Sequence, residues 1–582
     1  MIEKLARSIR EFMLSTILSP LCMVGEVYME VRIPQILATL VDKGVEVGNM
    51  DVIWQQGLNL VVTALLSLCF GVLSAVFAAH AATGFARNLR RDMYHKVQTY
   101  DFYNIDKFST SSIVTRLTTD VATLQNTFQM TIRMAIRCPM MVIMAIIRVY
   151  KLDPGLCLIY LIALPVLTLA LVVVVKLIFP LFDRVFTNYD KLNNTVQENI
   201  HGMRVVKSFV RESREEGKFN DTSNAIHRDF VKAEKLVALG SPLMQFTIYA
   251  CIIMISMIGA NMIVTSGNTT FTTGNLASMF TYTTQILSGL VMVSVVLVSL
   301  TMSRAPMKRT CEILSETPDL DSPENPVMEV KDGSIDFVDV SFRYNKNQEQ
   351  DALQKVQLHI EAGSTVGILG GTGSSKSTLV QLIPRLYDVT CGSVMVGGVD
   401  VRNYDLETLR QQVSMVLQKN VLFAGTIKEN LRWGNPDATD EELIHACKLA
   451  CAHDFIASFP DGYDTHIEQG GKNVSGGQKQ RLCIARALLK KPKILILDDS
   501  TSAVDTHTDA RIRKAFAEEI PGTTKLIIAQ RVASVQDADK IVVMDGGQVV
   551  AVGTHNELLR TSDIYREVHE SQTKGGQEEC PL

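Results

Sequence analysis

The chain has 582 residues, a formal net charge of −4 and a hydrophobic share of 47%. This length exceeds that of one ordinary domain, and the apolar share predicts a part embedded in a membrane. The nearly balanced charge excludes a large basic surface for nucleic acid, and the eleven cysteines lack the C-x-x-C pairs that would predict a zinc site.

Six apolar segments in the first half of the chain are each long enough to cross about 30 Å of hydrocarbon. They cover residues 12–41, 58–82, 130–150, 156–181, 237–264 and 276–302. The first follows three basic residues and is too long for the core of a secretory signal, so we expect a retained transmembrane helix. The links after the second and fourth segments are long and rich in Arg and Lys, which predicts that these links and the N-terminus are cytoplasmic.

Two carboxylates fall inside the first expected span, where an ionisable group is costly. Glu26 and Glu30 are four residues apart and therefore share one face of the helix. They either line a translocation path and attract cationic substrates, or they pair with arginines or reach the outer interface. Arg133 and Arg137 share one face of the third span in the same way.

The second half of the chain begins after a segment rich in Glu, Asp, Pro and Ser at residues 315–326, which we interpret as a linker. Strand and helix patterns then alternate, which predicts a mostly parallel α/β sheet. An apolar strand at residues 365–369 runs into a glycine-rich turn and then a helix, which is the context of a phosphate-binding loop. The loop consists of Gly370, Gly371, Thr372, Gly373, Ser374, Ser375, Lys376, Ser377 and Thr378.

In such a loop the lysine, Lys376, reaches the β- and γ-phosphates, and the hydroxyl of Ser377 binds Mg²⁺. Ser375 stands where the loop pattern has glycine, so we expect altered geometry at that turn. A second apolar strand, at residues 494–497, delivers Asp498 and Asp499 to its C-terminal edge, where open α/β sheets place their ligands.

Further stretches resemble the ordered motifs of ATP-binding-cassette (ABC) exporters, and the resemblance extends from the first helix to about residue 572. Tyr344 resembles the A-loop aromatic, Gln418 the Q-loop, residues 467–471 the X-loop, and Asp505 falls in the D-loop stretch after the acidic strand. Residues 102–120 and 197–209 resemble the two intracellular loops, whose tips carry coupling helices in that family. The signature motif is matched by Ser475, Gly476, Gly477 and Gln478.

The resemblance implies an ATPase that binds ATP and Mg²⁺, with Tyr344 stacked on adenine and with Ser377, Gln418 and Asp498 around the metal. In the family, the signature motif closes over the nucleotide of a second ATPase domain. Only one such domain is present in this sequence, so the resemblance implies a second half-transporter as partner.

Val474 replaces the usual leucine just before the signature residues, and three further departures from the family pattern belong to one nucleotide site. Ser375 replaces a glycine, Asp499 replaces the catalytic glutamate and Gln530 replaces the switch histidine, whereas the signature motif is intact. These departures resemble the degenerate-site subunit of bacterial heterodimeric multidrug exporters, which carry amphipathic drugs, lipids or peptides. The alternatives are a homodimeric exporter with two slow sites, or an ATP-gated channel or importer of the same fold.

We therefore expect an all-α polytopic membrane domain with six long helices and cytoplasmic extensions, followed by an α/β P-loop ATPase domain. The expected boundaries are a membrane domain at 1–310, a linker at 311–332, an ATPase domain at 333–572 and a tail at 573–582. The expected location is the bacterial plasma membrane, with the ATPase domain in the cytoplasm.

Overall fold

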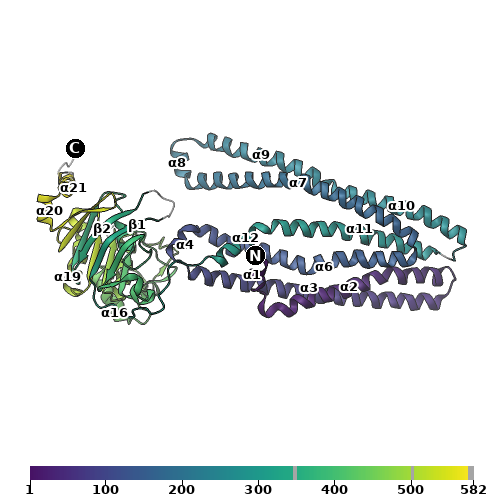
Figure 1. The fold of residues 1–582 in the computed structure, drawn as a ribbon, viewed down its shortest axis with the longest axis horizontal. Coiled ribbons are helices and arrows are strands. Elements are labelled where there is room, and N and C mark those ends of the chain that lie inside the picture. The colour runs from purple at the N-terminus through teal and green to yellow at the C-terminus, as the bar shows by residue number, and fades with distance from the viewer. Residues whose placement is uncertain (270, 345–349, 500–503, 575–582) are drawn as a thin grey trace. The chain divides into compact units, whose positions relative to one another are not determined.

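The computed structural model describes residues 1–269, 271–344, 350–499 and 504–574 (Figure 1). The chain forms two compact units. One contains Met1–Gln98 and Thr110–Glu316, and the other contains Thr99–Ser109 and Thr317–Leu582. The division after Glu316 falls inside the segment expected to be a linker.

The described residues of the first unit form helices joined by short turns, because long apolar runs satisfy their backbone hydrogen bonds best as helices in a membrane. Six of its described stretches are long and apolar enough to span a bilayer, as predicted. These stretches are Arg10–Val45, Met50–Gln98, Thr110–Leu152, Pro154–His201, Glu212–Ser266 and Thr273–Ser315.

The individual helices run well beyond the predicted apolar cores. They are α1 (Ile2–Ala6), η1 (Arg10–Phe12), α2 (Met13–Leu40), η2 (Val41–Val45), α3 (Met50–Gln98), α5 (Thr110–Thr115), η3 (Arg116–Asp120), α6 (Val121–Leu152), α7 (Pro154–His201), α8 (Met203–Ser208), α9 (Glu212–Ala238), α10 (Gly240–Ser266), α11 (Thr273–Met302) and α12 (Arg304–Ser315). Helix α2 packs against α3 and α6, and α7 runs beside α9 (Figure 1).

The turn between α6 and α7 follows directly from its sequence. The carboxylate of Asp153 accepts a hydrogen bond of 2.8 Å from the backbone N–H of Leu156 and so caps α7. Pro154 occupies the first turn, where its missing N–H costs nothing. Short helices also form in the two long polar links, α8 in one and α4 (Phe102–Lys107) in the other.

The second unit contains the predicted mostly parallel sheet, in the order β12-β11-β3-β10-β9-β6. All neighbours are parallel except β11 and β12. The strands are β3 (Thr365–Gly370), β6 (Val413–Val416), β9 (Ile494–Asp498), β10 (Thr524–Ile528), β11 (Lys540–Asp545) and β12 (Gln548–Gly553). Strands β9 and β10 are buried along their whole length, as expected for strands covered on both faces.

The unit also contains a separate antiparallel sheet, which the sequence did not suggest. Its strands come from the chain before and after β3. Its order is β2-β1-β4-β5, and a small pair is formed by β7 and β8. The strands are β1 (Ile335–Phe342), β2 (Leu353–Ile360), β4 (Cys391–Val396), β5 (Val399–Asp400), β7 (Gly425–Thr426) and β8 (His466–Ile467). Strands β1 and β2 mix buried and exposed positions, which is typical of antiparallel sheets with one solvated face.

Helices cover the sheets and complete this unit. Besides α4 they are α13 (Lys376–Gln381), η4 (Val401–Asn403), α14 (Leu406–Gln412), α15 (Ile427–Arg432), α16 (Asp440–Leu449), α17 (His453–Ala457), η5 (Gly462–Asp464), α18 (Gly476–Leu489), α19 (Thr506–Glu519), η6 (Val532–Ser534), α20 (His555–Thr561) and α21 (Asp563–Lys574). The carboxyl ends of β3, β9 and β10 meet at one edge of the parallel sheet, so the residues that follow them are brought together.

Candidate nucleotide site

The loop between β3 and α13 has the form of an anion cradle. Gly371 and Gly373 have open space where a Cβ atom would lie, so the loop backbone is accessible on that side. Gly370 is different, because a Cβ there would lie 2.3 Å from the carbonyl oxygen of Met544. Thr372 is exposed, whereas Ser374 is buried and donates a hydrogen bond of 2.9 Å to the carbonyl of Gly371.

Lys376 begins α13 and points back over the loop. Its Nζ donates hydrogen bonds to the carbonyl oxygens of Gly370 at 2.9 Å and Gly371 at 2.7 Å. Burial lowers the pKa of Lys376, while the nearby carboxylates Asp498 and Asp499 oppose that shift. A cation held in this position is suited to contact the phosphates of a nucleotide bound on the loop.

Ser375 adopts the left-handed conformation that the replaced glycine would favour. Its φ is 66° and its ψ is 26°, and its side chain makes no capping hydrogen bond to α13. For a residue with a Cβ atom this conformation costs about 1 kcal/mol. The loop therefore makes this turn with a serine, at the cost of backbone strain.

The end of β9 places Asp498 against α13. The hydroxyl of Ser377 donates a hydrogen bond of 2.9 Å to Oδ1 of Asp498. Asp498 is only 4% exposed, and this burial raises the pKa of its carboxyl group, with Asp499 adding to the shift and the Ser377 hydrogen bond opposing it. A bound divalent cation would favour the ionised form.

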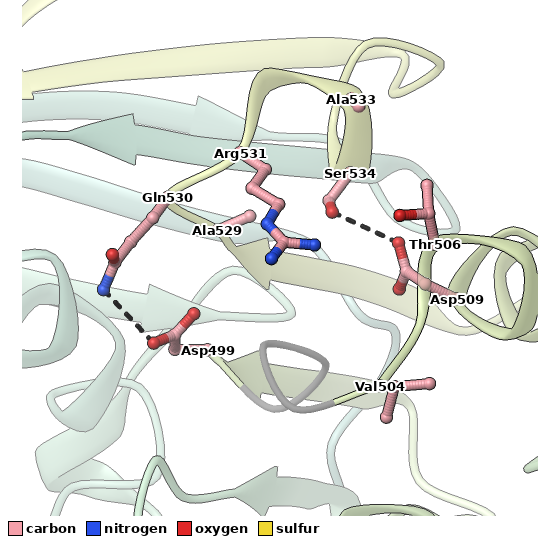
Figure 2. A pocket seen from close by; sticks show the side chains of 9 residues that line it. All are labelled: Asp499, Val504, Thr506, Asp509, Ala529, Gln530, Arg531, Ala533 and Ser534. Carbon is pink, nitrogen blue, oxygen red and sulfur yellow. Dashed lines mark hydrogen bonds between the residues drawn. The ribbon is translucent and has the colours of Figure 1, made fainter. Parts of the chain in front are cut away.

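Asp499, the next residue, lies beside the residue that replaces the switch histidine. The backbone N–H of Asp499 donates to the carbonyl of Ile528 at 3.1 Å, which sets Gln530 alongside it. The side-chain Nε2 of Gln530 donates to Oδ2 of Asp499 at 3.3 Å (Figure 2). Burial raises the pKa of Asp499, against an opposing hydrogen bond from the amide of Gln418. The structure thus brings Gln418, Asp499 and Gln530 together.

A cavity of about 330 Å³ adjoins this pair (Figure 2). Its walls come from the loop after β10 and from the start of α19, and they include Arg531, Asp509 and Ser534. Ser534 donates a hydrogen bond of 3.1 Å to Asp509, which ties η6 to α19. Asp505 caps α19 by accepting a hydrogen bond of 2.9 Å from the N–H of Thr508. Residues 500–503 of the predicted D-loop lie outside the described residues.

Tyr344 lies close to the same loop. Its hydroxyl is 3.0 Å from Oγ1 of Thr378 and donates to Oε1 of Gln381 at 3.3 Å. The rings of Phe342 and Tyr387 meet the tyrosine ring at steep interplanar angles of 80° and 87°. The tyrosine is thereby held next to α13, as a partner for a nucleotide base would need to be.

The signature residues form the N-terminus of α18. Oγ of Ser475 accepts from the N–H of Gln478 at 3.3 Å, and Oε1 of Gln478 accepts from the N–H of Ser475 at 2.9 Å. This reciprocal capping box fixes the first turn, which also contains Gly476 and Gly477. The positive N-terminal end of the 14-residue helix α18 is suited to bind an anion such as a phosphate.

The oxygen atoms of the site fit a magnesium ion. Mg²⁺ prefers oxygen ligands, and the Ser377 hydroxyl and Asp498 carboxylate provide two of them 2.9 Å apart. Gln418 contributes a side-chain amide next to this pair, where it hydrogen-bonds Asp499. These residues would hold the ion, which would neutralise charge on bound phosphates.

Glu26 and Glu30 both pair with one arginine on α6. Arg137 contacts Oε1 of Glu26 at 3.2 Å and Oε2 of Glu30 at 2.8 Å. Gly71 on α3 makes room for Glu26, because a Cβ at Gly71 would lie 3.1 Å from the Glu26 carboxylate carbon. One of the two alternatives for these glutamates, pairing with an arginine, is therefore present. Because two carboxylates face one guanidinium, one carboxylate is in excess.

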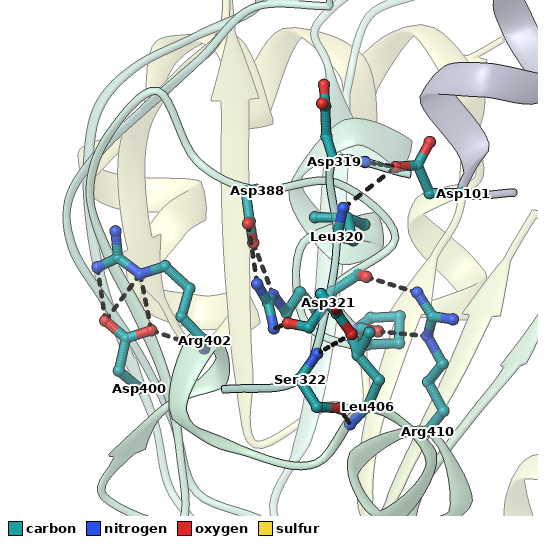
Figure 3. A network of polar contacts seen from close by, with 12 residues as sticks. Asp101, Asp319, Leu320, Asp321, Ser322, Asp388, Asp400, Arg402, Leu406 and Arg410 are labelled. Carbon is teal, nitrogen blue, oxygen red and sulfur yellow. Dashed lines mark hydrogen bonds and ion pairs between the residues drawn. The ribbon is translucent and has the colours of Figure 1, made fainter. Parts of the chain in front are cut away.

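Sequence reasoning missed the polar network around the expected linker (Figure 3). Oδ2 of Asp101 accepts from the backbone N–H groups of Asp319 at 2.8 Å and Leu320 at 3.2 Å, while Oδ1 caps α4. Arg385 donates to the carbonyl of Asp321 at 3.1 Å. The D-x-x-N spacing of Asp101 and Asn104 is a capping signal that could have indicated α4.

Comparison with known proteins covers nearly the whole chain. Residues 16–291 match the ABC transporter transmembrane region, and residues 353–502 match the ABC transporter family. The chain is 35% identical over 559 residues to the uncharacterized ABC transporter ATP-binding protein YfiB of Bacillus subtilis, covering 96% of each chain. It is 34% identical over 548 residues to the uncharacterized ABC transporter ATP-binding protein Rv1273c of Mycobacterium tuberculosis, covering 93% of each chain.

The fold also matches a solved structure. A bacterial Atm1-family ABC exporter with ATP bound aligns with a TM-score of 0.81, over 98% of this chain and 99% of that chain. The two sequences are 24% identical, so this likeness concerns the fold.

Proposed function

Because the chain belongs to the ABC transporter family and has the fold of its exporters, we propose that it is one half of a heterodimeric exporter whose own ATP site is catalytically impaired. Its family and fold make it an ATP-hydrolysing, multi-pass membrane transporter, and exporters of this kind work as dimers. The proposal adds that the partner is a different chain and that the two ATP sites are unequal.

One observation carries the proposal: the three departures from the family pattern meet in a single site. Ser375 bends the phosphate loop at a strained φ of 66°. Asp499 is shorter than the glutamate it replaces, and its carboxylate accepts a hydrogen bond from Gln530. Gln530 itself has no group that can become charged, unlike a histidine.

These features support ATP binding more strongly than ATP hydrolysis at this site. Lys376, the open loop backbone and Tyr344 are arranged to hold the phosphates and the base. Hydrolysis also needs a general base, and that base must come within hydrogen-bond reach of the attacking water. Asp499 is one carbon–carbon bond too short for the family's geometry, so we infer slow turnover at this site.

The signature turn supports the second half of the proposal. Ser475 and Gln478 form a reciprocal capping box that orders the first turn of α18, which supports a working signature motif for the partner's nucleotide. A self-paired chain would have two impaired sites, whereas a partner with a glutamate and a histidine would have one efficient site, completed by this chain. The proposed location is the bacterial plasma membrane, and the proposed cargo is a small amphipathic molecule such as a drug, lipid or peptide.

Two substitutions in this chain test the asymmetry within the assembled transporter. Asp499→Asn changes only the site built on this chain, so most Mg-ATP turnover is expected to remain. Gly477→Asp places a carboxylate in the signature turn, where it repels the γ-phosphate bound to the partner, and is expected to remove most turnover and leave only the slow rate of this chain's own site. Equal losses from both variants would refute the proposal.

The chain purified alone gives an independent check. Reconstituted in lipid nanodiscs, it is expected to hydrolyse Mg-ATP slowly while still binding a fluorescent ATP analogue. Rapid turnover that Asp499→Asn abolishes would show an active homodimer instead.

A further inference from the structure

The last helix of the ATPase unit, α21, carries one polar side chain to the loop that contains Gln530. Tyr565 on α21 is fully buried, and its hydroxyl is 2.7 Å from Nδ1 of His555 on α20. Val568 packs against the same core. Gln572 is seven residues beyond Tyr565 and four beyond Val568, so the three residues share one helix face.

The side-chain amide of Gln572 makes two hydrogen bonds to the backbone of this loop. Its Oε1 accepts from the N–H of Val532 at 2.9 Å, and its Nε2 donates to the carbonyl of Gln530 at 2.8 Å. Val532 begins η6, and the first N–H groups of a helix have no partner within it. Gln572 therefore supplies an acceptor that the loop lacks and occupies the neighbouring carbonyl at the same time.

The far end of the loop is fixed separately. Ser534, the last residue of η6, donates to Asp509 on α19 at 3.1 Å. Between these two attachments the loop backbone has little freedom. Among the described residues, the side chain of Gln530 has one hydrogen bond, the 3.3 Å bond to Asp499, and it has several rotatable bonds, so its orientation depends on where its backbone is held.

We propose that Gln572 is a positioning residue for the ATPase reaction, which holds the backbone of Gln530 so that its side chain faces Asp499 and the bound γ-phosphate. Gln572 contacts neither the nucleotide nor the reacting atoms. It acts through the two backbone hydrogen bonds, and α21 thereby sets the activity of this ATP site from outside the family motifs.

The test compares three variants of the full-length chain in its transporter assembly. Gln572→Ala removes both hydrogen bonds, and Gln572→Glu keeps only the acceptor for Val532. Ser571→Ala is the matched control, because this neighbour is exposed on the same helix. Hydrogen exchange of peptides spanning residues 529–535 is followed by mass spectrometry, since the Val532 amide is bonded directly to Gln572.

We expect exchange in this segment to accelerate about fivefold in Gln572→Ala, the change that loss of one typical hydrogen bond gives. The effect is smaller in Gln572→Glu and absent in Ser571→Ala, while exchange in β9 and β10 stays slow in every variant. Unchanged exchange at 529–535 in Gln572→Ala would overturn the proposal.

Kinetics separate positioning from general stability. Turnover of this site is measured with the partner's site blocked by Gly477→Asp. Gln572→Ala is expected to lower kcat about threefold to tenfold and leave KM for ATP unchanged, because the phosphate loop and Tyr344 are untouched. A rise in KM together with a lower melting temperature, or an equal effect of Ser571→Ala, would show a structural role instead.

Discussion

Restoring the missing methylene at Asp499 is expected to accelerate hydrolysis at this chain's own site. Asp499→Glu extends the carboxylate by one carbon–carbon bond, about 1.5 Å. Misplacement of a catalytic group by about 1 Å costs on the order of a hundredfold in rate, which corresponds to about 2.7 kcal/mol. Gln530 still lacks a histidine's chargeable donor, so we expect a gain of roughly tenfold to a hundredfold.

The geometry of the site favours this gain. Asp499 directly follows β9 with a φ of 47°, and its carboxylate accepts hydrogen bonds from the side-chain amides of Gln530, at 3.3 Å, and Gln418. A longer side chain from the same backbone can extend past that amide toward the phosphates held over Lys376. Burial, which raises the pKa of Asp499, also acts on a glutamate there and keeps it a stronger base than a free carboxylate.

The assay measures Mg-ATP turnover of the transporter with the partner's site blocked by Gly477→Asp in this same chain. The residual rate then reports the site built on Asp499. Asp499→Asn is the matched control, because it keeps the size of the side chain and removes the base. A rate in Asp499→Glu no higher than in Asp499→Asn, with ATP still bound, would refute the assignment of Asp499 as the impaired base.

Three further predictions concern strain, protonation and the membrane charges. Ser375→Gly is expected to stabilise the chain by about 0.5 kcal/mol, seen as a higher melting temperature, because glycine relieves the left-handed strain at a cost in chain entropy; a lower melting temperature would contradict this. Because the pKa of Asp499 is raised, turnover at its site is expected to fall with decreasing pH already above the ordinary carboxyl value of about 3.9. The contribution of this group to the free energy of unfolding is lost as pH rises through the raised pKa. The same fall of turnover at low pH in Asp499→Asn would exclude this carboxylate as its source. Arg137→Met is expected to destabilise the membrane unit by roughly 3 kcal/mol, because it leaves two unpaired carboxylates, whereas Glu30→Gln leaves the Glu26 pair intact and costs less; equal melting temperatures in detergent would show that the cluster carries no such energy.

Much of the fold could be predicted because the signals are local. A run of about twenty apolar residues can satisfy its backbone in a membrane only as a helix, and the six predicted spans are confirmed. The strand, glycine turn and helix around Lys376 form as their pattern indicates. The antiparallel sheet was missed, because short alternating strands such as β1 carry no information about which partner they choose.

The order of residues specifies which side chains are available: Asp499 and Gln530 in place of the family's glutamate and histidine, Ser375 in place of a glycine, and Glu26 and Glu30 within a span. Which of these side chains meet depends on the folded arrangement of the elements. The parallel register of β9 and β10 brings Gln530 to Asp499, and helix packing brings Arg137 to both membrane carboxylates. Gln572 reaches a backbone 40 residues away in the chain. Periodicity records which face of an element is buried, but contacts between distant residues depend on strand register and helix packing, which no local pattern contains.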